Sequence, residues 1–121
     1  MVDYFFDTYA LIELVKNNPS YVKVADEVVV TTQFNLVELF YRILEDYGED
    51  KAKEIYLKFK ACAAEIPDKI LFKSMIFRAK NKKRNLSYAD CIGYIFAIEN
   101  NIKFLTGDKE FEKMENVEFL K

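Results

Sequence analysis

The sequence predicts an α/β fold, a three-layer α/β/α sandwich whose central sheet is mostly parallel. Short apolar segments alternate along the chain with longer segments of helical periodicity, which is the order of β–α–β units. The short segments are apolar at successive positions, as expected for strands that are buried on both faces. Only three glycines and two prolines occur in 121 residues, which argues against a loop-rich all-β fold.

Strands are predicted where β-branched and aromatic residues form short runs. They lie at 2–6 (VDYFF), 28–32 (VVVTT), 102–106 (IKFLT) and 117–120 (VEFL), with a short edge strand near 64–66. Helices are predicted where apolar residues recur every three or four positions. They cover 8–18, 20–26, 34–48, 50–62, 68–82 and 88–99, and a short helix covers DKEFEKM, 108–114.

Composition and length predict one globular domain over residues 1–121, because 51% of the residues are apolar. The net charge of −2 neither supports nor excludes a nucleic-acid partner. No stretch approaches the roughly 20 apolar residues that cross a bilayer, and the N-terminus lacks the features of a signal peptide. We therefore expect a soluble, cytoplasmic protein without a membrane partner, in which Cys62 and Cys91 are reduced and packed in apolar surroundings.

Four carboxylates occupy positions that a parallel sheet brings to one end. Asp7 directly follows the first predicted strand, and Asp108 follows strand 102–106 by two residues. Glu38 lies in the second turn of the helix after the second strand, and Asp90 lies near the start of a later helix. Sites in open α/β sheets lie beyond the carboxyl ends of the strands, so the four acids are candidates for one shared site.

Each acid also has an ordinary structural explanation. Asp7 can cap the first helix, which contributes about 1 kcal/mol, and Asp108 can cap the short helix that follows it. In SYAD, Ser87 and Asp90 fit a capping box. Glu38 can be a solvated helix charge, although its immediate neighbours are apolar. For each acid taken singly, the sequence leaves both explanations open.

A cluster of these acids would need a compensating cation. Two unit charges about 5 Å apart repel by about 3 kcal/mol at an effective dielectric near 20. The chain contains no histidine, and oxygen ligands without histidine suit Mg²⁺ or Mn²⁺. These ions keep water and substrate phosphate in their remaining positions, which is the arrangement used for metal-assisted phosphodiester hydrolysis.

Four segments carry a resemblance to a known family. FFDTYAL, TTQFNLVELF, LSYADCIGYIFA and KFLTGDKEF occur in this order and span nearly the whole chain. Together they resemble the motifs of the PIN-domain ribonucleases, which include the toxins of VapBC-type toxin–antitoxin pairs. The residues that match the family's motifs are Asp7 with Thr8, Glu38, Ser87 with Asp90, and Thr106 with Asp108.

The resemblance implies a Mg²⁺- or Mn²⁺-dependent endoribonuclease, in which water attacks phosphorus and leaves a 5′-phosphate and a 3′-hydroxyl. The implied metal ligands and catalytic acids are Asp7, Glu38, Asp90 and Asp108. Thr8, Thr106 and Ser87 would support these acids through hydrogen bonds, with ordinary capping as the alternative. Glu110 and Asn35 are further candidates near the site, for which surface exposure is the alternative.

A basic cluster lies just before the helix that carries Asp90. The candidates for RNA binding in it are Arg78, Lys80, Lys82, Lys83 and Arg84. Cations there would offset phosphate charge, or they would simply complement the dipole at the end of the preceding helix. Tyr9 and Tyr88 are expected near the cleft, where a tyrosine either packs or stacks on a base.

The resemblance also implies partners: an RNA substrate, an antitoxin protein whose tail occupies the cleft, and a second copy of the chain. The apolar residues in 50–77 that either form this dimer surface or belong to the core are Ile55, Tyr56, Phe59, Leu71 and Phe72. The alternative function is a catalytically inactive PIN-like binding or scaffold module. The presence of all four acids counts against that alternative.

Overall fold

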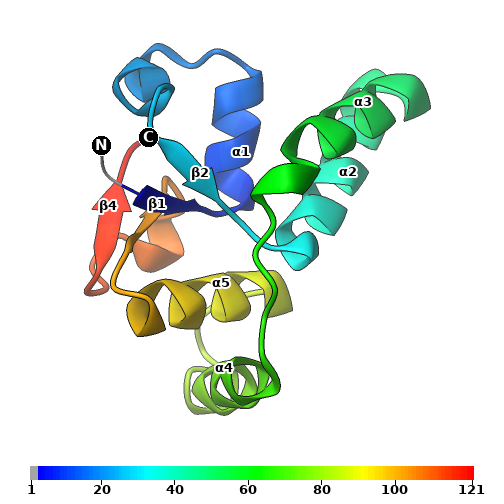
Figure 1. The fold of residues 1–121 in the computed structure, drawn as a ribbon. Coiled ribbons are helices and arrows are strands. Elements are labelled where there is room, and N and C mark those ends of the chain that lie inside the picture. Colours follow the sequence, from blue (N-terminus) through cyan, green and yellow to red (C-terminus); the bar gives the residue numbers. More distant parts are fainter. Residues whose placement is uncertain (1–2) are drawn as a thin grey trace.

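The computed structural model describes residues 3–121 and contains one four-stranded sheet (Figure 1). Its strands are β1 (Asp3–Phe6), β2 (Val28–Val30), β3 (Lys103–Thr106) and β4 (Val117–Phe119), in the order β2–β1–β3–β4. All three strand pairs are parallel, and Phe5 of β1 lies beside both Val30 and Phe104. The predicted parallel sheet is confirmed. Position 2 of the first predicted strand lies outside the described residues.

Within residues 3–121, five α-helices and three short 3₁₀ segments connect the strands. The α-helices are α1 (Thr8–Val15), α2 (Gln33–Tyr47), α3 (Glu49–Phe59), α4 (Asp68–Lys80) and α5 (Tyr88–Glu99). The 3₁₀ segments are η1 (Pro19–Val24), η2 (Lys60–Cys62) and η3 (Lys109–Phe111). The helices predicted at 20–26 and 108–114 are therefore 3₁₀ segments, and the helix predicted at 50–62 ends as α-helix at Phe59.

The edge strand predicted near 64–66 was wrong. The chain touches the sheet there only through a single bridge between Thr31 and Ala63. Two hydrogen bonds hold that bridge, from the Thr31 N–H to the Cys62 carbonyl and from the Ala64 N–H to the Thr31 carbonyl. Pro67 follows three residues later and has no N–H with which to extend a ladder.

Two apolar cores lie on opposite faces of the sheet, because successive strand residues point in opposite directions. Phe6 and Leu105 pack with residues of α1, α2 and α3 on one face. Phe5 and Phe104 pack with residues of α4 and α5 on the other, with their rings stacked at a centroid distance of 5.6 Å. The three-layer α/β/α arrangement is confirmed (Figure 1).

Burial corrects part of the predicted dimer surface. Ile55 and Phe59 are buried in the core, and Tyr56 and Leu71 are partly buried. Only Phe72, whose relative exposure is 66%, is largely exposed among the five predicted residues. The two cysteines form no disulfide, as expected. Within residues 3–121, the helices are too short or too polar to cross a membrane.

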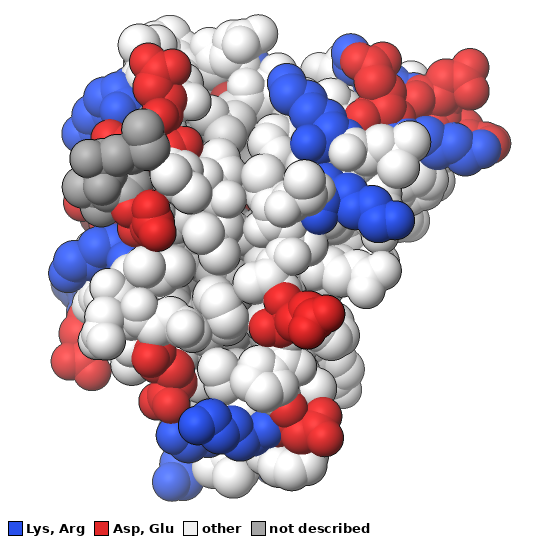
Figure 2. Space-filling model, viewed as in Figure 1, with Lys and Arg blue, Asp and Glu red and all other residues white. Residues whose placement is uncertain are grey.

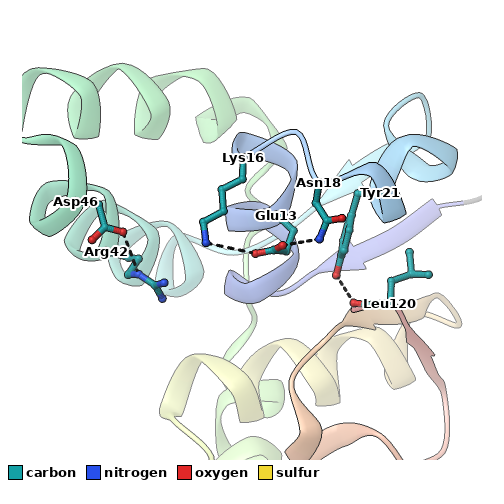
Figure 3. A network of polar contacts seen from close by, with 7 residues as sticks. All are labelled: Glu13, Lys16, Asn18, Tyr21, Arg42, Asp46 and Leu120. Atoms are coloured by element: carbon teal, nitrogen blue, oxygen red, sulfur yellow. Dashed lines mark hydrogen bonds and ion pairs between the residues drawn. The ribbon is translucent and has the colours of Figure 1, made fainter.

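Figure 3 shows the polar contacts around η1, including one from Tyr21 to Leu120 near the end of the chain. The Asn18 side-chain amide donates to Glu13 Oε1 at 2.6 Å, and the Tyr21 hydroxyl donates to the Leu120 carbonyl at 2.8 Å. The Leu120 N–H donates in turn to the Thr106 carbonyl at 2.8 Å. The segment η1 thus holds the last strand against β3 at the point where the candidate site begins.

Candidate active site

Asp7 ends β1 and caps α1 at the same time. Its N–H donates to the Leu105 carbonyl at 3.3 Å, and its Oδ1 accepts the Ala10 N–H at 2.8 Å. The Thr106 side chain forms a further hydrogen bond with this carboxylate. Asp7 is only 1% exposed. The capping explanation is therefore correct, and it leaves a buried acid at the carboxyl end of the sheet.

Thr106 connects Asp7 with Asp108. Its Oγ1 accepts the Asp108 N–H at 3.0 Å, so its own hydroxyl proton is available for the Asp7 carboxylate. Asp108 caps η3, because its Oδ1 accepts the Glu110 N–H at 3.0 Å. The predicted supporting role of Thr106 thus corresponds to a contact that joins the ends of β1 and β3.

Asp90 lies at the N-terminus of α5 in the capping box that SYAD predicted. The Asp90 N–H donates to Ser87 Oγ at 3.0 Å, and the Ser87 N–H donates to Asp90 Oδ2 at 2.9 Å. One carboxylate oxygen is therefore held by Ser87. The reciprocal bonds fix the orientation of a partly buried acid at the start of α5.

Glu38 reaches the site from α2 and is held by Thr8. The Thr8 hydroxyl donates to Glu38 Oε1 at 2.7 Å, which joins α1 to α2. The Asn35 side-chain amide donates to Thr8 Oγ1 at 3.2 Å. Asn35 is completely buried, so the solvent-exposed alternative for this residue was wrong.

The four acids influence one another electrostatically. Burial raises the pKa of Asp7 well above its ordinary value, and the charges of Asp90 and Asp108 raise it further, against the hydrogen bonds from Thr106 and Ala10. Burial is also the largest cause that raises the pKa of Asp90 to about 6, with contributions from Glu38 and Asp108. These effects place acids from four separate segments in one neighbourhood.

Within residues 3–121, none of the four acids forms an ion pair with a lysine or arginine. Among residues 3–121, the ion pairs all lie elsewhere, on α1, within α2 and α3, and between α4 and α5. Carboxylates that are buried close to like charges favour the proton or a cation over the free charged form. The site is therefore suited to a positively charged ligand.

The acids fit a hard cation that is bound partly through water. In the part of the chain that the structure describes, no three acidic or cysteine side chains are placed to hold a metal ion directly. Each of the four acids uses one oxygen in a hydrogen bond with protein. Mg²⁺ commonly uses one or two carboxylates and keeps several waters. The oxygen donor set is compatible with that mode of binding.

Two of the five predicted RNA-binding residues lie beside the site. The Arg78 guanidinium lies 4.6 Å from the centroid of the Tyr88 ring, and Arg84 donates to the Glu110 carbonyl at 3.1 Å. Glu110 also accepts the Asn85 N–H through its carboxylate, so it holds the α4–α5 loop next to Asp108.

On the face that Figure 2 shows, the described charged residues of the α2–α3 pair form no single basic surface. Figure 2 shows acidic and basic side chains side by side over the outer end of the α2–α3 pair. The remaining predicted RNA-binding residues are exposed at the end of α4 and in the following loop: Lys80, Lys82 and Lys83. A direct role in RNA binding remains a prediction for all five residues.

A groove of about 290 Å³ adjoins Glu38 between α2 and α5. Phe34, Val37 and Tyr88 line it, and Tyr88 is 62% exposed. A larger groove of about 510 Å³ between α2, η2 and residues 63–66 contains none of the four acids in its lining. The smaller groove is therefore the one that bears on the site.

Gly107 is required by close packing behind Asp108. A Cβ atom there would overlap the Tyr9 ring and the Leu120 carbonyl oxygen. We expect Gly107→Ala to cost about 1–3 kcal/mol of unfolding free energy, as overpacking does in other cores, and to displace the Thr106–Asp108 turn. Chemical denaturation measures the cost. Gly48→Ala is the control for backbone strain. A Cβ at position 48 meets no atom within 4 Å, so any loss of stability there comes from the φ of 88° and not from packing. A neutral Gly107→Ala would contradict the packing argument.

The family model of the PIN domain matches residues 4–117. The chain belongs to the PIN domain family. The match covers β1 through the start of β4 and includes all four acids. No curated protein matches the sequence significantly.

Solved PIN-domain structures share this fold over nearly its full length. The sarcin–ricin-loop-cleaving toxin VapC20 of Mycobacterium tuberculosis has a TM-score of 0.77 at 15% identity, covering 98% of this chain and 99% of that one. VapBC2 of Rickettsia felis, solved bound to a promoter DNA fragment, has a TM-score of 0.73 at 17% identity, covering 99% and 100%. A toxin–antitoxin complex from Klebsiella pneumoniae has a TM-score of 0.70 at 18% identity, covering 95% of each chain.

Proposed function

We propose that this PIN domain is a divalent-metal-dependent endoribonuclease. One observation carries the proposal: at the carboxyl end of the sheet, the charges of Glu38, Asp90 and Asp108 act on buried or partly buried acids. Asp90 and Asp108 raise the pKa of Asp7, and Glu38 and Asp108 raise the pKa of Asp90. No ion pair within residues 3–121 neutralises them. The proposed ligands and catalytic acids are Asp7, Glu38, Asp90 and Asp108.

Bound Mg²⁺ or Mn²⁺ would polarise a phosphate oxygen and make water a stronger nucleophile. In this proposal Asp7 and Asp90, the two acids with raised pKa, are the principal holders of the ion, and Asp108 completes the site directly or through water. Glu38 is tied to Thr8 by one oxygen. Its second oxygen then orients the attacking water.

The RNA would enter beside Glu38. The groove lined by Phe34, Val37 and Tyr88 adjoins this acid, and exposed aromatic rings stack on unpaired bases. The Arg78 guanidinium lies over the Tyr88 ring. Arg84 donates to the carbonyl of Glu110, which lies two residues after Asp108. In this proposal both arginines offset phosphate charge on the bound RNA.

A role as the toxin of a toxin–antitoxin pair is the second part of the proposal. The structural neighbours include a toxin–antitoxin complex and a VapBC assembly. Helix α2 presents exposed apolar side chains at spacings of three and four residues, as a protein partner would require: Phe34, Val37, Tyr41 and Leu44. We propose that an antitoxin segment covers this face, and that a homodimer forms through exposed residues of α3 and α4 such as Leu57, Phe72 and Ile76.

Two experiments test the proposal. Mn²⁺ is titrated into the protein in a calorimeter, and the protein is incubated with Mn²⁺ and either an RNA or the DNA of the same sequence. We expect a saturable heat of binding and cleavage of RNA alone. Asp7→Asn should remove both, whereas Asp26→Asn, which changes an exposed acid away from the site, should leave both intact. A wild-type protein that neither binds Mn²⁺ nor cleaves RNA would favour the inactive binding module.

A further inference from the structure

Asn35 has a buried side chain in which both polar atoms form hydrogen bonds. It lies on the first turn of α2 and is 0% exposed. Its Oδ1 accepts the Thr32 hydroxyl at 2.6 Å, and its Nδ2 donates to Thr8 Oγ1 at 3.2 Å. Thr8 donates onward to Glu38. A chain of three side-chain hydrogen bonds therefore runs from the start of α2 to a candidate catalytic acid.

The direction of every proton in this chain follows from the donors and acceptors. Thr32 Oγ1 accepts the backbone N–H of Asn35 at 3.2 Å, so the hydroxyl proton of Thr32 is free to donate to Asn35 Oδ1. This fixes the amide with its NH₂ group toward Thr8. Because the Thr8 oxygen accepts from that NH₂ group, its only proton is directed to Glu38 Oε1.

We propose that Asn35 is a positioning residue for metal binding. It sets the direction of the Thr8 hydroxyl, and that hydroxyl holds one oxygen of Glu38, so that the other oxygen is the one available to the ion or its water. This inference rests on the proposed function of the site. Side chains that orient metal ligands typically change metal affinity by about 10–100-fold when they are removed.

The competing explanation is purely structural. A buried asparagine that bonds to Thr32 and Thr8 also fastens α2 to α1, and its loss would leave buried polar groups unpaired. That explanation predicts a less stable protein with unchanged affinity for the ion. The two explanations therefore separate when stability and metal affinity are measured on the same variants.

The test uses Asn35→Leu, Thr8→Val and the double variant, each titrated with Mn²⁺ by calorimetry and unfolded without metal. We expect each single change to weaken Mn²⁺ binding by about tenfold or more. The double variant should bind no more weakly than the weaker single variant, because both changes interrupt the same chain. Thr8→Ser keeps the hydroxyl and should restore most of the Mn²⁺ affinity that Thr8→Val loses.

The matched control is Ser74→Ala. Ser74 is also 0% exposed, and Ser74→Ala removes one buried hydrogen bond, to the Ile70 carbonyl within α4. It should lower the unfolding free energy and leave Mn²⁺ affinity unchanged. Unchanged affinity in Asn35→Leu or in Thr8→Val, or effects that multiply in the double variant, would overturn the inference while leaving the proposed function intact. Absence of Mn²⁺ binding in the wild type would overturn both.

Discussion

Asp90→Asn is expected to abolish metal-dependent RNA cleavage and to make the metal-free protein more stable. The rate should fall by at least about 10³-fold, since the change removes a charge that the reaction needs. The stability should rise because burial and the charges of Glu38 and Asp108 raise the pKa of Asp90 from 3.8 to about 6. A shift of that size corresponds to at most about 3 kcal/mol at neutral pH. Cleavage assays and denaturant unfolding in EDTA measure the two effects.

The substitution changes the charge while keeping the local structure. The side-chain oxygen of an asparagine at position 90 still accepts the Ser87 N–H, so the start of α5 is retained. Asp68→Asn is the control of opposite sign, because Asp68 is an exposed acid in the first turn of α4. Its loss should cost about 0.3–1 kcal/mol and leave cleavage intact. A destabilised Asp90→Asn variant would contradict the electrostatic argument.

The site was predictable where the acids lie at strand ends. Asp7 follows the buried strand β1 directly, and Asp108 follows β3 by two residues; parallel strands place their carboxyl ends together. The capping explanations for Asp7, Asp90 and Asp108 are correct as well. The capping role and the role in the candidate site are compatible here. Each capping contact uses one carboxylate oxygen and fixes the acid at the start of a helix.

The supporting contacts were less predictable. The sequence contains Thr32 and Asn35 three residues apart, as for a helix start, but it does not show that Asn35 is buried against Thr8. That contact depends on how α1 and α2 cross, which local periodicity does not determine. The signal available was the N-cap at Thr32, which places Asn35 and Glu38 on one helical face.

Amphipathic patterns also failed to separate core from surface. Ile55 and Phe59 face the core of the α2–α3 side, whereas the equally apolar Phe34 and Val37 are 43% and 58% exposed. Each of these helices carries more apolar residues than its packing against neighbouring elements buries. Only the three-dimensional arrangement decides which apolar stripe remains open, here the one beside Glu38.

The metal-free protein is expected to lose stability as the pH rises from about 4 through 6 and beyond. Asp7 and Asp90 have raised pKa values in the folded state, so in this interval the folded protein binds more protons than the unfolded chain. Stability then falls with increasing pH, by the linkage between proton binding and folding. For Asp90 the loss begins above the ordinary pKa of 3.8 and is complete above about 6. Asp7 extends the loss toward higher pH.

Bound Mn²⁺ should reverse this dependence, because the ion competes with protons for the same carboxylates. At 100 times its dissociation constant, an ion that binds only the folded state adds about 2.7 kcal/mol, and this gain should disappear at pH 5. Unfolding at pH 5 and pH 7.5, in EDTA and in saturating Mn²⁺, gives the four values needed. Asp90→Asn should flatten both curves. Metal-free stability that rises from pH 5 to 7.5 would mean that the folded protein already neutralises these acids, and a cation would then have no electrostatic reason to bind there.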